Sequence, residues 1–174
     1  GSIDNNSLTI TNTPSNYTNS GILVSNSGSD DHLWIDRNEL ETKNADGVRL
    51  LNTRTKMYYN SIKTDSDNPG DNNAGFKSDG SVGYIANNRV TGDDAHGMMF
   101  TNPGSTDTDP DGLFLCYNSV GMDADNNTSI YVDGGMNNGL NFRRNMVMNF
   151  GNGASMYADN VTGNPLNSDE NNLR

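Results

Sequence analysis

Apolar residues along this chain fall in short clusters around repeated asparagines, and no long helical periodicity is present. In five segments, an apolar residue stands three positions before an asparagine and another stands two positions after it. The asparagines are Asn38, Asn60, Asn88, Asn118 and Asn145, spaced by 22, 28, 30 and 27 residues. The residues before them are Ile35, Met57, Ile85, Leu115 and Phe142, and those after them are Leu40, Ile62, Val90, Val120 and Val147. A looser copy follows at Asn160.

A second apolar cluster alternates with the first. It begins with a small residue, which is followed by an apolar residue, any residue and a second apolar residue. The copies begin at Gly21, Gly47, Gly75, Gly97 and Ser129, and the copy at Gly75 is weaker because Ser78 replaces its last apolar residue. Each period therefore predicts three short strands, and a period of about 20–50 residues indicates stacked repeats. Helical repeats are excluded because Ala, Glu and Leu are scarce.

Three short strands per period, joined by loops of variable length, predict an all-β fold. We expect a right-handed parallel β-helix of about six coils with three sheets. This arrangement, over about residues 8–163, resembles the pectin-lyase-like superfamily.

Such a fold accounts for the repeated asparagines. Coils stack about 4.8 Å apart, so equivalent asparagines would lie above one another and bond through their amide donors and acceptors. The resemblance likewise implies an inward asparagine ladder at the tight turn between the second and third sheets. The alternative is a plain turn asparagine that faces solvent.

The remaining segments lie at the two ends. Residues 1–7 are interpreted as a tag remnant and N-terminal lead-in, because Gly1-Ser2 is typical of a protease-cleavage scar. Residues 164–174 contain no copy of the repeat and are interpreted as a C-terminal tail. Solenoid ends expose open strands and usually need caps. No cap is evident, so we expect either a fragment of a longer protein or ends covered by a partner.

Composition and charge narrow the function. The 174 residues carry a net charge of −11, which argues against a nucleic-acid or anionic-membrane partner. No stretch is apolar enough for membrane insertion. The single cysteine, Cys116, excludes an internal disulfide and is predicted to be a buried structural thiol. The asparagine-rich, cysteine-poor composition favours an extracellular, cell-surface or virion location.

The Gly-initiated strands predict a candidate binding face. If Ile22, Val48, Phe76, Met98 and Ile130 point inward, an outward column consists of Leu23, Arg49, Lys77, Met99 and Tyr131. In the family that the chain resembles, this outer face of the first sheet forms the floor of a saccharide groove. The resemblance implies that Arg49 and Lys77 bind carboxylate or sulfate groups and that Tyr131 stacks on a sugar. The alternative is an ordinary solvated sheet face.

Two further segments resemble catalytic motifs of polygalacturonase-type glycosidases. These are the sequence NADG at residues 44–47 and His96-Gly97, which would make Asp46 and His96 catalytic. The family's aspartate pair is replaced here by NNAG at residues 72–75. An inverting hydrolase needs two carboxyl groups about 6.5–9.5 Å apart. Asp93 and Asp94 could supply them only by reaching from a neighbouring loop, so we lean against an enzyme.

An acidic loop suggests a metal site. Asp107, Asp109 and Asp111 followed by Gly112 resemble the start of an EF-hand calcium loop. The twelfth position is Asn118, which the ladder already uses, so a full EF-hand is rejected. A looser calcium site built from several loops and plain solvated turns are the two alternatives. Lyases of this fold use calcium with an Arg or Lys base, a role that Arg49 or Lys77 could fill.

Other outward residues suggest partners. Trp34 is expected outside the second sheet, as a saccharide platform, a protein contact or a side chain partly covered by a loop. The residues just before the ladder are Arg37, Tyr59, Asn87, Tyr117 and Arg144, a composition that favours an interface with another chain, including a second copy.

The sequence thus favours a glycan-associated module that binds a polysaccharide or cell-surface glycan along the first sheet. The first alternative is a structural rod, such as a phage tail-fibre, tailspike or adhesin segment, with neighbouring domains or copies as partners. The second alternative is a polysaccharide lyase or glycoside hydrolase that acts on an acidic polysaccharide.

Overall fold

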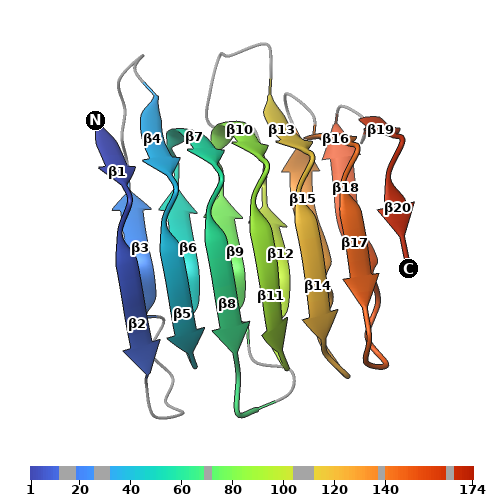
Figure 1. Ribbon diagram of the computed structural model, residues 1–174. Coiled ribbons are helices and arrows are strands. Elements are labelled where there is room, and N and C mark those ends of the chain that lie inside the picture. The colour runs from blue at the N-terminus through green and yellow to red at the C-terminus, as the bar shows by residue number, and fades with distance from the viewer. Residues whose placement is uncertain (12–18, 26–31, 69–71, 104–111, 137–139, 164–166) are drawn as a thin grey trace.

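The chain folds as a right-handed parallel β-helix. The computed structural model describes residues 1–11, 19–25, 32–68, 72–103, 112–136, 140–163 and 167–174. Every regular element in these ranges is a β-strand, and every strand pairing is parallel. As the chain advances from left to right in Figure 1, it descends on the near side and rises on the far side, which is a right-handed path. The predicted fold is therefore confirmed.

Three sheets form the walls of the solenoid. Sheet A contains β1 (Ser2–Asp4), β4 (Leu33–Asp36), β7 (Arg54–Tyr58), β10 (Val82–Ala86), β13 (Leu113–Cys116), β16 (Leu140–Arg143) and β19 (Asn167–Asp169). Sheet B contains β2 (Ser7–Thr11), β5 (Glu39–Lys43), β8 (Ser61–Asp65), β11 (Arg89–Asp93), β14 (Ser119–Asp123), β17 (Met146–Asn149) and β20 (Asn172–Leu173). Sheet C contains β3 (Ser20–Ser25), β6 (Asp46–Leu51), β9 (Ala74–Asp79), β12 (His96–Thr101), β15 (Ile130–Met136) and β18 (Met156–Gly163). Each coil visits A, B and C in turn, which gives six complete coils and a seventh that begins with β19 and β20.

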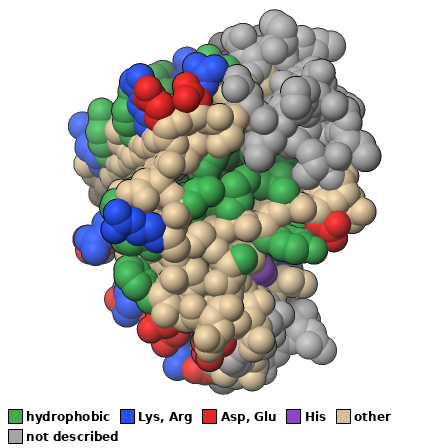
Figure 2. Space-filling model, turned by 90° about the vertical axis from the view of Figure 1, so that its right-hand side faces the viewer, with side chains coloured by type: hydrophobic (Ala, Val, Ile, Leu, Met, Phe, Trp, Pro, Cys, Tyr) green, Lys and Arg blue, Asp and Glu red, His purple; other side chains and the backbone are tan. Residues whose placement is uncertain are grey.

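The solenoid extends beyond the range predicted for it. Strand β1 pairs with β4, and strands β19 and β20 pair with β16 and β17. The segments interpreted as lead-in and tail thus continue sheets A and B. At the C-terminal end, hydrophobic side chains gather in the middle of the surface (Figure 2). Leu173 stacks on Val147 but remains 46% exposed, because no described strand covers this end of sheet B.

The core is built from the apolar residues of the two repeated patterns. Those that flank the asparagines are buried, as are the inward residues of sheet C, Ile22, Val48, Phe76, Met98 and Ile130. Strand residues alternate between core and surface, and equivalent residues of successive coils lie in register. Both sequence patterns therefore predicted correctly which residues face the core.

The bends from A to B and from C to A use residues with positive φ, which let the chain turn sharply. At the bend from A to B these are Asn5, Arg37, Tyr59, Asn87, Tyr117, Arg144 and Glu170, with φ between 52° and 58°. At the bend from C to A the column contains Asn52, Gly80, Asn102, Gly134 and Asn160. Asn160 was expected to be a looser ladder residue, and that prediction was wrong. It shares its backbone conformation with Asn52 and Asn102 and lies at the bend from C to A, at the other end of sheet A from the ladder.

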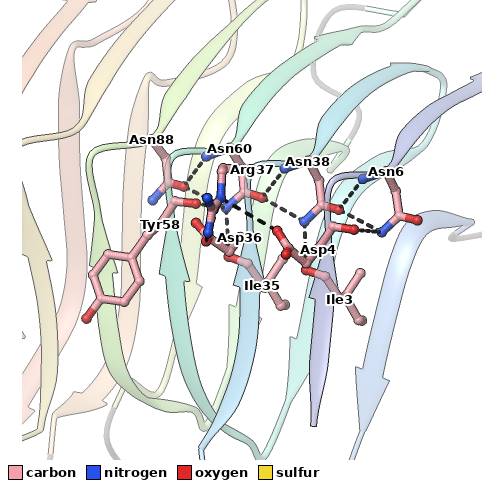
Figure 3. Close-up of polar contacts among 10 residues, drawn as sticks. All are labelled: Ile3, Asp4, Asn6, Ile35, Asp36, Arg37, Asn38, Tyr58, Asn60 and Asn88. Carbon is pink, nitrogen blue, oxygen red and sulfur yellow. Dashed lines mark hydrogen bonds and ion pairs between the residues drawn. The ribbon is translucent and has the colours of Figure 1, made fainter.

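The asparagine ladder runs along the bend from A to B, immediately after the positive-φ residues (Figure 3). Asn38 donates from its backbone N–H and its Nδ2 to Oδ1 of Asn60, both at 2.9 Å. Asn60 repeats the two bonds to Asn88, and Asn88 to Asn118. Nδ2 also donates to a backbone carbonyl of the preceding coil, as from Asn60 to Ile35 at 2.9 Å. The predicted inward ladder is confirmed.

Two additional rungs lie at the ends of the ladder. Asn6 donates to Oδ1 of Asn38, and Oδ1 of Asn171 accepts from Asn145. Asn171 is preceded by Ser168 at the position where the other rungs have an apolar residue, so the sequence pattern did not reveal it.

Candidate functional site

The outer face of sheet C carries the column that the sequence predicted, which we call the sheet C column. In register along the axis are Leu23, Arg49, Lys77, Met99 and Tyr131, and the column continues with Tyr157. Leu23 and Tyr157 are exposed, and the four residues between them are half-buried. The structure therefore brings Arg49, Lys77 and Tyr131 together on one face, with the two cations on adjacent coils.

Tyr131 and Tyr157 form an aromatic platform at one end of the column. Their rings are stacked, with centroids 5.7 Å apart and an angle of 17° between the planes. The sequence analysis missed Tyr157. The signal was present but weak, because Ser155-Met156-Tyr157-Ala158 repeats the small, apolar, any, apolar pattern with alanine in last place.

Asp46 is fully buried, and the charges of Lys77 and Arg49 act on its carboxyl. Its Oδ1 accepts the backbone N–H of Ala74 at 2.9 Å, whereas Oδ2 has no hydrogen-bond partner. Burial raises the pKa of the Asp46 carboxyl, and the charges of Lys77 and Arg49 partly offset this. Because no oxygen of this carboxyl reaches the surface, the geometry gives Asp46 a structural role in the sheet and no contact with a ligand.

Lys77 and Arg49 are both half-buried on this face. Burial lowers the pKa of Lys77, while Asp46 acts in the opposite direction and Arg49 reinforces the decrease. The ammonium of Lys77 donates to the backbone carbonyl of Asn72 at 2.8 Å. The Nε of Arg49 is buried without a hydrogen-bond partner. These cations thus retain donor capacity that an anionic or hydroxyl-bearing ligand can use.

His96 stands beside the column, two coils from Asp46. Ala74 lies between them in register, so coil stacking separates the two by about 9.6 Å along the axis. Nδ1 of His96 accepts the backbone N–H of Thr128 at 3.1 Å, and the ring lies 5.5 Å from that of Tyr131. Burial lowers the pKa of His96. The neutral imidazole therefore supports the aromatic platform and does not contact Asp46.

Asp93 and Asp94 lie on a different part of the surface. Asp93 ends β11 on the outer side of sheet B, and Asp94 occupies the bend to sheet C with a φ of 50°. Asp93 is in register with Asp65 and Asp123. Burial and the neighbouring carboxylates raise the pKa of Asp93. The four proposed catalytic residues are therefore not gathered into one site.

The predicted calcium ligands Asp107, Asp109 and Asp111 lie outside the described residues. Within the part of the chain that the structure describes, no group of three or more His, Cys, Asp or Glu residues is arranged to hold a metal ion.

The outer face of sheet A carries the aromatic side chains of Trp34, Tyr58, Tyr84 and Phe114. Trp34 faces outward as predicted, with the ammonium of Lys56 5.1 Å from its ring centroid. Tyr84 and Phe114 stack at 4.9 Å, one coil apart. Cys116 faces the same side and is only half-buried, so the prediction of a buried thiol was wrong. The cause is strand alternation, because the neighbouring Leu115 takes the inward position.

Comparison with protein-family models, curated proteins and solved structures finds no match to this chain. Sheet topology and register thus carry the fold assignment, and the resemblance to pectin-lyase-like proteins stays a prediction. None of the described residues forms a helix long and apolar enough to cross a membrane.

Proposed function

We propose that this chain is a polysaccharide-binding module whose ligand lies along the sheet C column. The observation that carries the proposal is the register of Arg49, Lys77, Met99, Tyr131 and Tyr157, which repeats once per coil. A linear polymer parallel to the axis would meet one side chain of this column on each successive coil. Apolar and aromatic groups with a few directed polar groups are the usual components of a ligand site.

The chemistry of the column favours an acidic polysaccharide. Arg49 and Lys77 can donate charge-assisted hydrogen bonds to carboxylate or sulfate oxygens. The stacked rings of Tyr131 and Tyr157 offer an apolar surface with phenolic hydroxyls at its edge. Binding is favoured over cleavage, because Asp46 is fully buried and the other candidate carboxylates lie near sheet B.

A glycan panel tests this proposal, with binding and product release measured together, in calcium and in chelator. We expect an acidic polysaccharide to bind, and alanine at Arg49, Lys77 and Tyr131 to weaken binding at least tenfold. Lys43→Ala and Tyr117→Ala on other faces are the matched controls. Unchanged binding in the triple variant would refute the proposal. Release of reducing ends or unsaturated products would favour an enzyme instead, and loss of binding in chelator would indicate calcium.

A structural or assembly role is the second candidate, and the bend from A to B supports it. Tyr59 and Tyr117 lie at this bend with side chains that are 63% and 53% exposed. Both residues also have a positive φ, which is unfavourable for bulky residues. Arg144 donates to the hydroxyl of Tyr117 at 2.6 Å. Tyrosine and arginine are enriched at protein interfaces. Light scattering at high concentration should then show an oligomer that Tyr59→Ser with Tyr117→Ser dissociates, whereas a strictly monomeric chain would argue against assembly.

A further inference from the structure

A hollow on the outer face of sheet B is formed where a coil lacks a side chain. Gly121 in β14 lies in register between Thr91 of β11 and Met148 of β17. Two adjoining depressions, of about 250 and 450 Å³, meet at this glycine and share Thr91 and Phe150 as lining residues. We call the two together the sheet B hollow. It lies on a different sheet from the sheet C column.

The two walls of the sheet B hollow differ in chemistry. The wall on the C-terminal side consists of Met146, Met148 and Phe150. Phe150 is 67% exposed and Met146 is 42% exposed, so this apolar surface faces water. Contiguous exposed apolar side chains of this kind are typical of ligand or partner sites, unlike apolar residues scattered singly.

The opposite wall and the floor are polar and carry both signs of charge. Arg89 lines the smaller depression and Asp93 and Asp123 line the larger one, and none of the three forms an ion pair within the described ranges. Lys63, also at the rim, is already bound to Glu41 at 2.9 Å and to Asp65 at 3.3 Å. A guanidinium only donates hydrogen bonds and a carboxylate only accepts them. The sheet B hollow therefore offers a donor in its smaller depression and acceptors in its larger one.

The apolar wall and the mixed charges of the sheet B hollow together favour one class of ligand. A cation would be repelled by Arg89 and an anion by Asp93 and Asp123, so mixed charge favours a neutral molecule that both donates and accepts. A sugar ring has an apolar face of C–H groups and a rim of hydroxyls, which matches one apolar and one polar wall. The size of the hollow is also that of small-molecule sites, which occupy about 300–1,000 Å³.

We propose that the sheet B hollow binds a neutral sugar ring, with its C–H face on Phe150 and Met148. Its hydroxyls donate to Asp93 and Asp123 and accept from Arg89. Because the proposed polysaccharide lies on sheet C, the two sites are independent. Substitution of Tyr131 by alanine should leave this second site intact, so each proposal can fail without the other.

Ligand-observed NMR with methyl glycosides of glucose, galactose, mannose and N-acetylglucosamine tests the proposal. We expect saturable binding of at least one sugar. Phe150→Ala and Asp123→Asn should each weaken it at least fivefold, while Glu39→Gln, at the far end of the same sheet, should leave it unchanged. Gly121→Leu fills the hollow and should abolish binding.

A second substitution guards against misfolding of the leucine variant. A Cβ on Gly121 would lie 3.6 Å from Phe150 Cε2, an ordinary contact, so Gly121→Ala fits the fold and should still weaken binding. The proposal is overturned if none of the four glycosides binds saturably, or if both Gly121 variants bind as the unmodified chain does. Preferential binding of phenyltrimethylammonium would also overturn it, because that result would identify a cation site.

Discussion

Oδ1 of Asn88 accepts two hydrogen bonds from Asn60, one from the backbone N–H and one from Nδ2, both at 2.9 Å. Both residues are almost completely buried. One carbonyl oxygen therefore satisfies two buried donors of the preceding coil. The same pair of hydrogen bonds recurs at each rung. The asparagines are polar residues in an apolar wall, and these bonds link each coil to the next.

Replacement of Asn88 by alanine should reduce the free energy of unfolding by at least about 2 kcal/mol. It leaves the buried backbone N–H of Asn60 without its acceptor, at about 1–3 kcal/mol, and also removes the Nδ2 donor that serves the Met57 carbonyl and Oδ1 of Asn118. Chemical denaturation followed by circular dichroism measures the change. Asn126, which is exposed, supplies the control, and Asn126→Ala should lie within about 0.5 kcal/mol of the unmodified chain. Equal effects at both positions would contradict the role of the ladder.

Gly92 and Gly121 should respond very differently to alanine. A Cβ on Gly92 would lie 1.7 Å from the backbone oxygen of Thr64, whereas on Gly121 it meets only Phe150 at 3.6 Å. The first contact forces two coils apart, since backbone cannot yield as a flexible side chain does. We expect Gly92→Ala to cost about 3 kcal/mol or more and Gly121→Ala to be nearly neutral. Thermal unfolding compares the pair, and a Gly92→Ala protein of unchanged stability would disprove the packing argument.

Tyr59 should be replaceable by asparagine with a gain in stability. Its φ of 56° lies in the left-handed region, which costs a bulky residue about 1 kcal/mol and which asparagine tolerates better. We expect Tyr59→Asn to raise the free energy of unfolding by about 0.5–1 kcal/mol. Tyr157→Asn, on an extended strand, is the control and should lower it. A loss at position 59 would show that the contact with Tyr58 outweighs the backbone cost.

Acidification should destabilise the chain through His96. Burial lowers its pKa in the folded state below the ordinary value of 6.5. As the pH falls through this value, the unfolded chain binds a proton that the folded chain does not, so the free energy of unfolding decreases. Denaturation at pH 7.5 and 5.5 should show a smaller decrease for His96→Gln than for the unmodified chain.

Asp46 provides the opposite control. Its pKa is raised, so its contribution to stability grows as the pH falls through its folded pKa. Asp46→Asn removes this compensation and keeps the oxygen that accepts from Ala74. The decrease between pH 7.5 and 5.5 should therefore be equal or larger in Asp46→Asn, and a smaller decrease would contradict the assigned direction.

The sequence by itself determined which residues of each coil form the ladder, the core and the outer surface. Asn88, Ile85 and Val90 keep fixed offsets, and strand alternation together with coil stacking converts those offsets into a ladder, an inner wall and an outer column. The same alternation and stacking predict that Arg49, Lys77 and Tyr131 lie in register. These features are local, because each coil repeats the geometry of the one beneath it.

Only the tertiary structure decided what depends on neighbouring coils. Asp46 is buried, with the charges of Arg49 and Lys77 from two coils acting on it, and the hollow at Gly121 exists because Phe150 and Met148 project from the next coil. The rung at Asn171 lacks the apolar residue that marks the others, so its place follows from the strand pairing of β19 and β20. Burial and concavity are properties of stacked neighbours, and no offset within one repeat specifies them.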